Sequence, residues 1–133
     1  MSSNGFFRYS LEDNIHHVTA LQGTGEAIKV MLEYMGSLFE GVPMTEKVRI
    51  MLDFRLVPRP SITEWVMPTL AFFRRQGPET GHPSRVAYIY ARSSRGSILT
   101  GILSLQRFMP LPVTMRLFQE GEEAQAREWL QVA

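Results

Sequence analysis

The segment Lys47 to Leu56 constrains the fold more than any other. It reads Lys-Val-Arg-Ile-Met-Leu-Asp-Phe-Arg-Leu, with a nearly continuous apolar centre. A strand with apolar residues on both faces must be covered on both faces, as happens in the middle of a parallel sheet. A further strand is predicted at Arg85 to Ala91, whose centre is Val-Ala-Tyr-Ile-Tyr-Ala. The sequence therefore favours a sheet flanked by helices.

The first 40 residues predict a hairpin followed by a helix. Phe6 to Leu11 and Ile15 to Leu21 are rich in aromatic and β-branched residues, and Glu12-Asp13-Asn14 between them is typical of a turn. Thr24 is a suitable N-cap for the helix that follows. The apolar residues of that helix recur at steps of three and four positions: Ile28, Met31, Leu32, Met35, Leu38 and Phe39.

Two more helices are predicted on either side of the strand at Arg85 to Ala91. The first begins at Ser61, which has the capping-box spacing with Glu64, and Pro68 should kink it. The loop Gln76 to Ser84 ends it. The second carries apolar residues on one side, namely Ile98, Ile102, Leu105 and Phe108.

The chain closes with a strand and an amphipathic helix. The strand is predicted at Val113 to Phe118 and the helix at Glu120 to Leu130, with Ala124, Trp129 and Leu130 as its packing residues. The complete order is ββαβαβαβα. It predicts a single α/β domain over residues 1–133, with a mixed sheet of about five strands flanked by helices.

Composition excludes several classes of function. The chain has no cysteine, so it has no disulfides and no thiolate metal sites. The formal net charge of +1 provides no field for nucleic acid. No apolar run approaches the length of a membrane span or a secretory signal, so we expect a cytoplasmic protein without membrane insertion.

The chain resembles the STAS and SpoIIAA-like family, which includes anti-sigma-factor antagonists and shares its fold loosely with lipid-binding CRAL-TRIO domains. The resemblance rests on the element order, on the strands Val48 to Phe54 and Arg85 to Tyr90, and on the ending Met115-Arg116-Leu117-Phe118 with Ala124 and Trp129-Leu130. It implies a SpoIIAA-like fold and a non-catalytic regulatory or protein-interaction module with a protein partner. A homodimer is one form that this contact could take.

The resemblance also implies a role for Ser61. In anti-sigma antagonists, a serine at the start of the corresponding helix is phosphorylated, and Ser61 occupies that position. The capping box explains Ser61 together with Glu64 and is the interpretation that we favour. Both interpretations stay open on the sequence.

Four arginines follow two of the predicted strands: Arg55 and Arg59 after one, Arg92 and Arg95 after the other. Open α/β sheets bind ligands outside the carboxyl ends of their strands. With Ser61, these residues are our candidate site for a ligand or partner. The alternative function is binding of a small anionic or lipid-like ligand at this edge. The competing structural interpretation is that the arginines are solvated or paired with Glu64 and Glu79.

The remaining polar residues do not predict catalysis. We expect Asp53 to pair with an arginine or to accept backbone N–H groups, although a catalytic role is the alternative. His16 and His17 are adjacent on a strand and point to opposite faces, so they cannot chelate one metal ion. The Gly23-Thr24-Gly25 segment lacks the third glycine of a dinucleotide-binding loop. The sequence therefore predicts no enzyme, no metal site and no cofactor.

Adjacent large apolar residues mark a second candidate surface. Phe72-Phe73 and Phe108-Met109 each place two large side chains side by side on a predicted helix. One of each pair lies either on a dimer or partner surface or under a loop.

Overall fold

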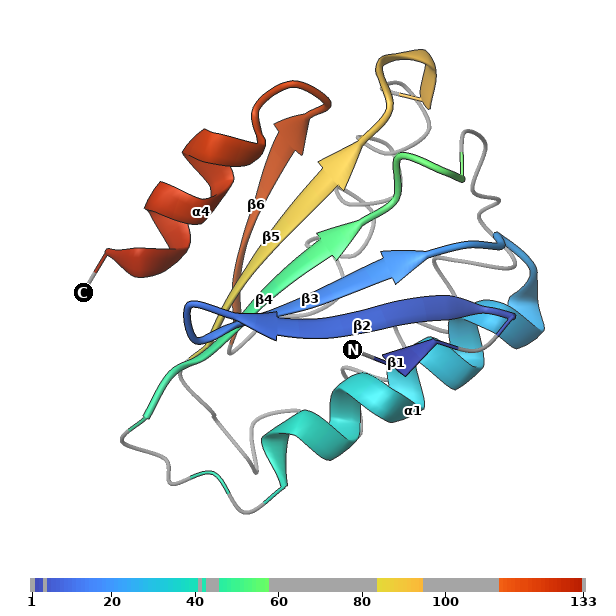
Figure 1. The fold of residues 1–133 in the computed structure, drawn as a ribbon, viewed down its shortest axis with the longest axis horizontal. Coiled ribbons are helices and arrows are strands. Elements are labelled where there is room, and N and C mark those ends of the chain that lie inside the picture. Colours follow the sequence, from blue (N-terminus) through green and yellow to red (C-terminus); the bar gives the residue numbers. More distant parts are fainter. Residues whose placement is uncertain are drawn as a thin grey trace.

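The chain forms an α/β sheet with one helix on each face, in the parts that the structure describes (Figure 1). This computed structural model describes residues 2–3, 5–40, 42, 46–57, 84–94 and 113–132. Two predicted helices lie outside the described residues: the one that begins at Ser61 and the one that carries Ile98 to Phe108. The same is true of the pairs Phe72-Phe73 and Phe108-Met109.

Six strands make one mixed sheet, and their order in space is their order in the sequence. They are β1 (Ser2–Ser3), β2 (Phe7–Glu12), β3 (Ile15–Ala20), β4 (Val48–Asp53), β5 (Ser84–Tyr90) and β6 (Val113–Gln119). β1, β2 and β3 pair antiparallel, and β3 to β6 pair parallel. The α/β class and the five predicted strands are confirmed, and the two-residue β1 is an addition.

Three helical segments are described: α1 (Gly25–Phe39), the short 3-10 helix η2 (Arg92–Ser94) and α4 (Glu123–Gln131). No described helix is both long and apolar enough to cross a membrane.

The predicted hairpin and the predicted helix cap are both confirmed. Asp13 and Asn14 connect β2 to β3 with φ of 52° and 65°, the left-handed conformation that a two-residue hairpin turn of this kind requires. These residue types tolerate it because their short side chains bond locally. At the start of α1, the Ala27 N–H donates to Thr24 Oγ1 over 3.2 Å.

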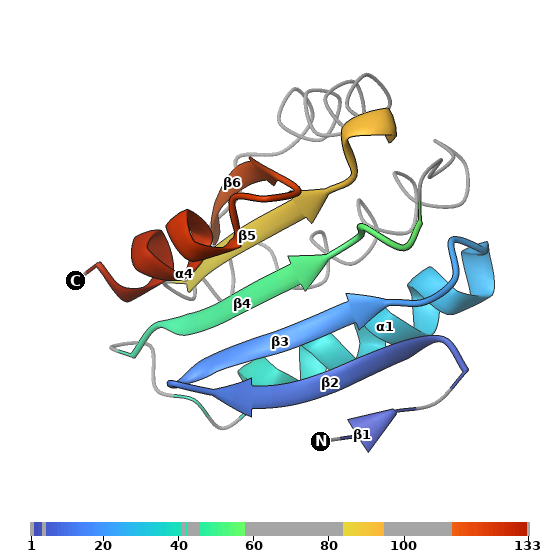
Figure 2. The same ribbon diagram turned by 45° about the horizontal axis from the view of Figure 1, so that its top comes forward.

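The central strands bury side chains on both faces, as the run at Lys47 to Leu56 predicted. On one face Ile50, Leu52 and Tyr88 pack with α1, and Tyr88 stacks on Phe54 with ring centroids 4.8 Å apart. On the other face Met51 and Ile89 pack with α4. Figure 2 shows the two helices on opposite sides of the sheet.

The prediction for the last helix needs two corrections. α4 begins at Glu123 rather than Glu120, because Gly121 adopts a φ of 97° in a turn after β6. Ala124 is exposed rather than packed, and Ala126 is buried in its place. The helix packs through Ala126 and Leu130, which are four positions apart and so share a face, with Trp129 partly buried beside them.

Gly23 lies where the end of β3 passes the chain beyond β4. A Cβ at this position would lie 2.5 Å from Val57 Cγ1, whereas a Cβ at Gly5 would find nothing nearer than 3.9 Å. We expect Gly23→Ala to lower the free energy of unfolding by about 1–3 kcal/mol, because Val57 is buried and must shift. Urea denaturation measures this difference. Gly5→Ala is the control and should change the value by less than about 0.5 kcal/mol; equal effects at both positions would contradict the contact.

Candidate functional site

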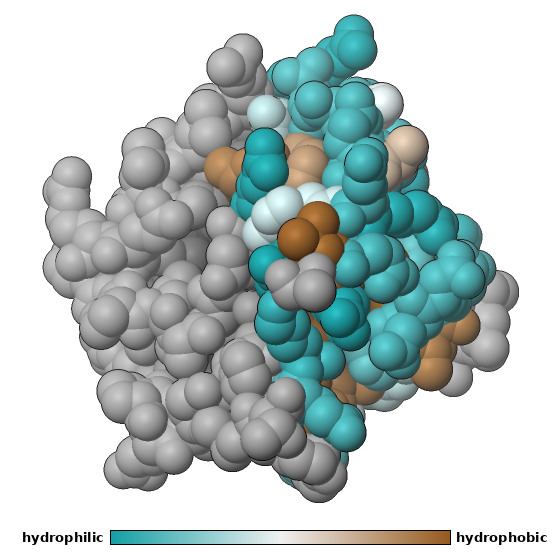
Figure 3. All heavy atoms as spheres, turned by 90° about the vertical axis from the view of Figure 1, so that its left-hand side faces the viewer, coloured by the Kyte–Doolittle hydropathy of each residue, from teal (hydrophilic) through white to brown (hydrophobic). Residues whose placement is uncertain are grey.

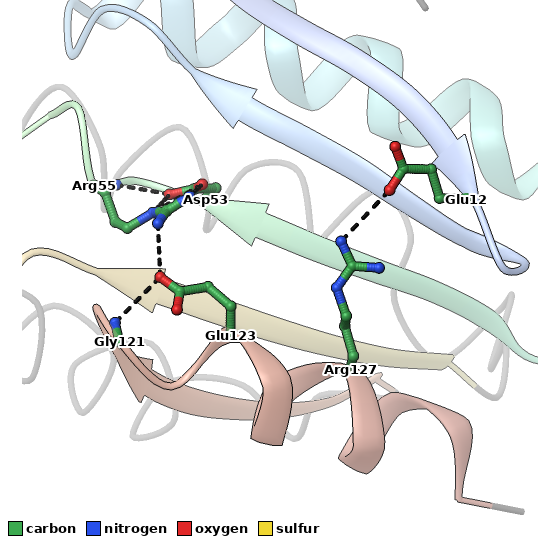
Figure 4. A network of polar contacts seen from close by, with 6 residues as sticks. All are labelled: Glu12, Asp53, Arg55, Gly121, Glu123 and Arg127. Atoms are coloured by element: carbon green, nitrogen blue, oxygen red, sulfur yellow. Dashed lines mark hydrogen bonds and ion pairs between the residues drawn. The ribbon is translucent and has the colours of Figure 1, made fainter.

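Asp53 and Arg55 form a tight pair where β4 ends (Figure 4). The Arg55 N–H donates to Asp53 Oδ1 over 3.0 Å, so the carboxylate holds the turn that follows the strand. The Arg55 guanidinium donates to the same carboxylate, with Nη2 lying 2.6 Å from Oδ2. Both parts of the predicted structural role of Asp53 are therefore confirmed, since it accepts a backbone N–H and pairs with an arginine.

Arg55 also reaches across the sheet to the start of α4. Its Nη1 donates to Glu123 Oε1 over 2.6 Å, and the Gly121 N–H donates to the same oxygen over 3.1 Å. Backbone N–H groups of Glu123 and Gly121 lower the pKa of the Glu123 carboxyl, and Arg55 lowers it further. The hydrogen bond to Asp53 raises the pKa of Arg55. Two carboxylates thus compensate the charge of this arginine.

Arg92 meets the same turn through its main chain. Its N–H donates to Glu120 Oε1 over 3.1 Å, and the Glu120 N–H donates to the Tyr90 carbonyl over 2.8 Å. Two of the predicted site residues therefore lie close together, since Arg55 contacts the first residue of α4 and Arg92 contacts the turn that precedes it. The other three, Arg59, Ser61 and Arg95, lie outside the described residues.

An open hollow of about 470 Å³ lies beside this network. It is lined by Arg8, Thr19, Asp53, Arg55, Leu56 and Glu120. Arg8 is paired in register with Thr19, and Thr19 with Asp53, so one row across β2, β3 and β4 forms part of the lining. Its volume lies in the range of ordinary ligand pockets.

Arg8, Thr19 and Glu120 were not among the predicted site residues. Alternation is the signal that would have found Arg8, since Arg8, Ser10 and Glu12 occupy every second position of β2, whereas no local pattern marks Thr19 or Glu120. Such alternation predicts one face without an apolar cover. α4 contacts β4, β5 and β6, and in the views of Figures 1 and 2 no described helix lies over β2 and β3 on that face.

Polar contacts also hold the other end of α4. Arg127 lies 3.4 Å from Glu12 Oε2, and Gln131 Nε2 donates to the Asp13 carbonyl over 2.7 Å. From the strands beneath, Arg49 donates to the Leu130 carbonyl over 2.8 Å and Arg85 to the Trp129 carbonyl over 2.9 Å. Basic groups are favourable there because the carbonyls at the end of a helix have no internal partners.

The two histidines point to opposite faces, as predicted. His16 Nδ1 lies 2.8 Å from the Tyr9 hydroxyl on the α1 side. His17 lies on the α4 side, where its buried Nε2 has no hydrogen-bond partner among the described residues and is 3.9 Å from Glu12 Oε2. Within the described residues no three carboxylates or histidines are grouped as a metal site would need.

Known proteins add nothing to this geometry: no family model, no curated protein and no solved structure matches the chain. The site must be interpreted from its own residues.

The network predicts unequal costs for its two carboxylates. Asp53→Ala should lower the free energy of unfolding by about 1–3 kcal/mol, because the Arg55 N–H loses its acceptor together with the ion pair. Glu123→Ala should cost less than about 1 kcal/mol, since its pair with Arg55 is substantially exposed and the Gly121 N–H that it accepts belongs to an exposed residue, where water can replace the carboxylate. Urea unfolding of both variants measures the order, and a larger cost at Glu123 would contradict it.

The histidines predict a loss of stability in mild acid. Burial lowers the pKa of both, with further lowering of the pKa of His16 by His17 and of His17 by Arg127. The unfolded chain, in which histidine titrates near pH 6.5, therefore binds protons more readily than the folded chain. Stability should be full above that pH and should fall as the pH drops through about 6.5 towards the lower folded-state values.

Unfolding free energies at pH 7.5, 6.5 and 5.5 test this expectation. A His16→Gln, His17→Gln double variant should lose less stability between pH 7.5 and 5.5 than the unmodified chain. An equal or steeper loss in the double variant would show that other groups cause the pH dependence.

Proposed function

We propose that this chain is a non-catalytic protein-interaction module of the STAS and SpoIIAA-like type, which binds a protein partner at the carboxyl edge of its sheet. The observation that carries the proposal is the hollow beside Leu56. That leucine is 57% exposed, and charged groups of both signs line the hollow around it. An apolar contact within a polar, charged rim is the usual composition of a protein interface.

The charges at this edge favour a protein over a small anion. Arg55 is already compensated by Asp53 and Glu123, and Glu120 adds a further carboxylate to the lining. An anion that approaches Arg55 would meet these carboxylates at short range, and Arg8 is the one unpaired cation among the described lining residues. The alternative of a small anionic ligand is therefore the weaker one at the described part of the edge.

A lipid-like ligand is also poorly supported here. Leu56 is the one large apolar side chain among the lining residues of this hollow. Binding of an acyl chain is stabilised in proportion to the apolar surface that is removed from water. A hollow lined mostly by charged and hydroxyl groups provides little apolar surface.

The opposite end of the molecule has a different character. Figure 3 shows the side with the β2–β3 turn and the C-terminus, where the described residues are largely hydrophilic with separate hydrophobic spots. There, polar side chains contact other groups of the same chain: Arg127 pairs with Glu12, and Gln131 donates to the Asp13 carbonyl. Leu11 and Val132 are nearly as exposed as Leu56, and single exposed apolar residues are ordinary on a protein surface, so the feature that distinguishes Leu56 is its place in the lining of the hollow.

The family part of the proposal rests on the sequence resemblance described above. The resemblance implies phosphorylation of Ser61, the alternative to the capping box that we favour, and such a modification would place about two negative charges after β4 in the sequence. With the arginines of this edge nearby in the sequence, that charge would alter partner binding.

Site-specific crosslinking tests the proposed surface. A photo-crosslinking amino acid in place of Leu56, in cells of the source organism, should yield a discrete covalent adduct with one protein, visible as a shifted band after irradiation.

Leu11 provides the matched control, since it is 55% exposed and lies near the β2–β3 turn. The same amino acid at position 11 should give no discrete adduct. Adducts of equal yield at both positions, or none at position 56, would overturn the proposal.

A further inference from the structure

Two charges at the hollow are available to a partner. Arg8 is exposed, and its guanidinium has no ion-pair or hydrogen-bond partner among the described residues. Glu120 is also exposed; its Oε1 accepts from the Arg92 N–H, its other oxygen has no hydrogen-bond partner in the part of the chain that the structure describes, and its charge acts on the nearby Arg55. The other charged lining groups, Asp53 and Arg55, are paired with each other.

These two charges approach the hollow from different strands. Arg8 lies on β2, and Glu120 follows β6, so β3, β4 and β5 lie between their backbones. Neighbouring strands are about 4.8 Å apart, which separates the two backbones by four such steps. Both side chains reach inward to line the hollow and so shorten this separation of about 19 Å, and two residues of an extended peptide span about 6.6 Å of what is left.

The floor between them suits a peptide. Thr19 offers a hydroxyl, Leu56 offers an apolar surface, and the charges of Asp53 and Arg55 are held in ion pairs with each other and with Glu123. Side chains at alternate positions of an extended segment point the same way, so residues two apart can reach both charges.

We infer that the hollow binds an extended segment of the partner that carries one acidic and one basic side chain two residues apart, the acidic one on Arg8 and the basic one on Glu120. This inference rests on the proposed function and gives the chemistry of the partner at that same surface. The arrangement would select against segments with charges of one sign, because each leaves one lining charge facing its like.

Four capped tripeptides serve as probes: acetyl-Glu-Ala-Lys-amide, acetyl-Lys-Ala-Glu-amide, acetyl-Glu-Ala-Glu-amide and acetyl-Lys-Ala-Lys-amide. Each is titrated at low salt into the isotope-labelled full chain, and amide shifts are followed by NMR. We expect the better mixed-charge peptide to bind about fivefold more tightly than either like-charged peptide, with shifts at Arg8, Thr19, Leu56 and Glu120.

Charge reversal turns this preference into a specific readout. Arg8→Glu makes both available charges negative, so the chain should then prefer Lys-Ala-Lys. Glu120→Lys makes both positive, so it should prefer Glu-Ala-Glu. Lys29→Glu, at an exposed position on α1, is the control and should leave the order of the peptides unchanged.

Three results would overturn the inference: equal binding of all four peptides, shifts that lie away from the hollow, or an order that the reversals do not change. Free glycine, whose two charges are adjacent, should bind more weakly than the mixed peptides, and equal binding would contradict the extended segment.

If Leu56 yields a partner adduct but the peptides are not discriminated, this inference fails and the proposed function stands. If Leu56 yields no adduct, the proposed function fails.

Discussion

The double-sided burial of β4 and β5 is the constraint on which the rest of the structure depends. Ile50 and Val86 are almost fully buried on the α1 side, and Ala87 and Ile89 are fully buried on the α4 side. Each large apolar side chain removed from water contributes about 1.5–3 kcal/mol. If either face of these two strands were exposed to water, this stabilisation would be lost. The composition of two strands therefore requires helices on both faces of the sheet.

The second face is covered only in part, and polar contacts determine where the cover lies. α4 buries few large side chains, chiefly Leu130 with part of Trp129. It is positioned by arginines from the strands: Arg49 and Arg85 bond its last carbonyls, and Arg55 bonds Glu123 in its first turn. Cations at the end of a helix and a carboxylate at its start both agree with the helix dipole. Because α4 lies over β4, β5 and β6, the polar row from Arg8 to Asp53 stays open and forms the hollow.

Local patterns in the sequence were sufficient for the strands and helices that the structure describes and insufficient for the site. The hairpin, the Thr24 cap and the central strands could be predicted because each depends on neighbours a few residues away. Ala124 does not share the packed face because it lies six positions from Leu130, whereas the buried Ala126 lies four positions from it. The arginine contacts could not be predicted, since Arg49 and Leu130 are 81 positions apart in the chain and Arg55 and Glu123 are 68 apart. The hollow arises from the same long-range contacts, so its lining combines four separate segments.

A working surface at the carboxyl edge is the central claim, and amide hydrogen exchange tests it without altering the chain. Exchange would be measured by mass spectrometry on the full chain, alone and after recovery with its bound partner from the source cells. We predict slower exchange in the partner-bound sample in the segments 51–57 and 116–125, with no change in the segment 9–16 around the hairpin turn. Protection confined to the segment 9–16, with unchanged exchange at the carboxyl edge, would contradict the claim.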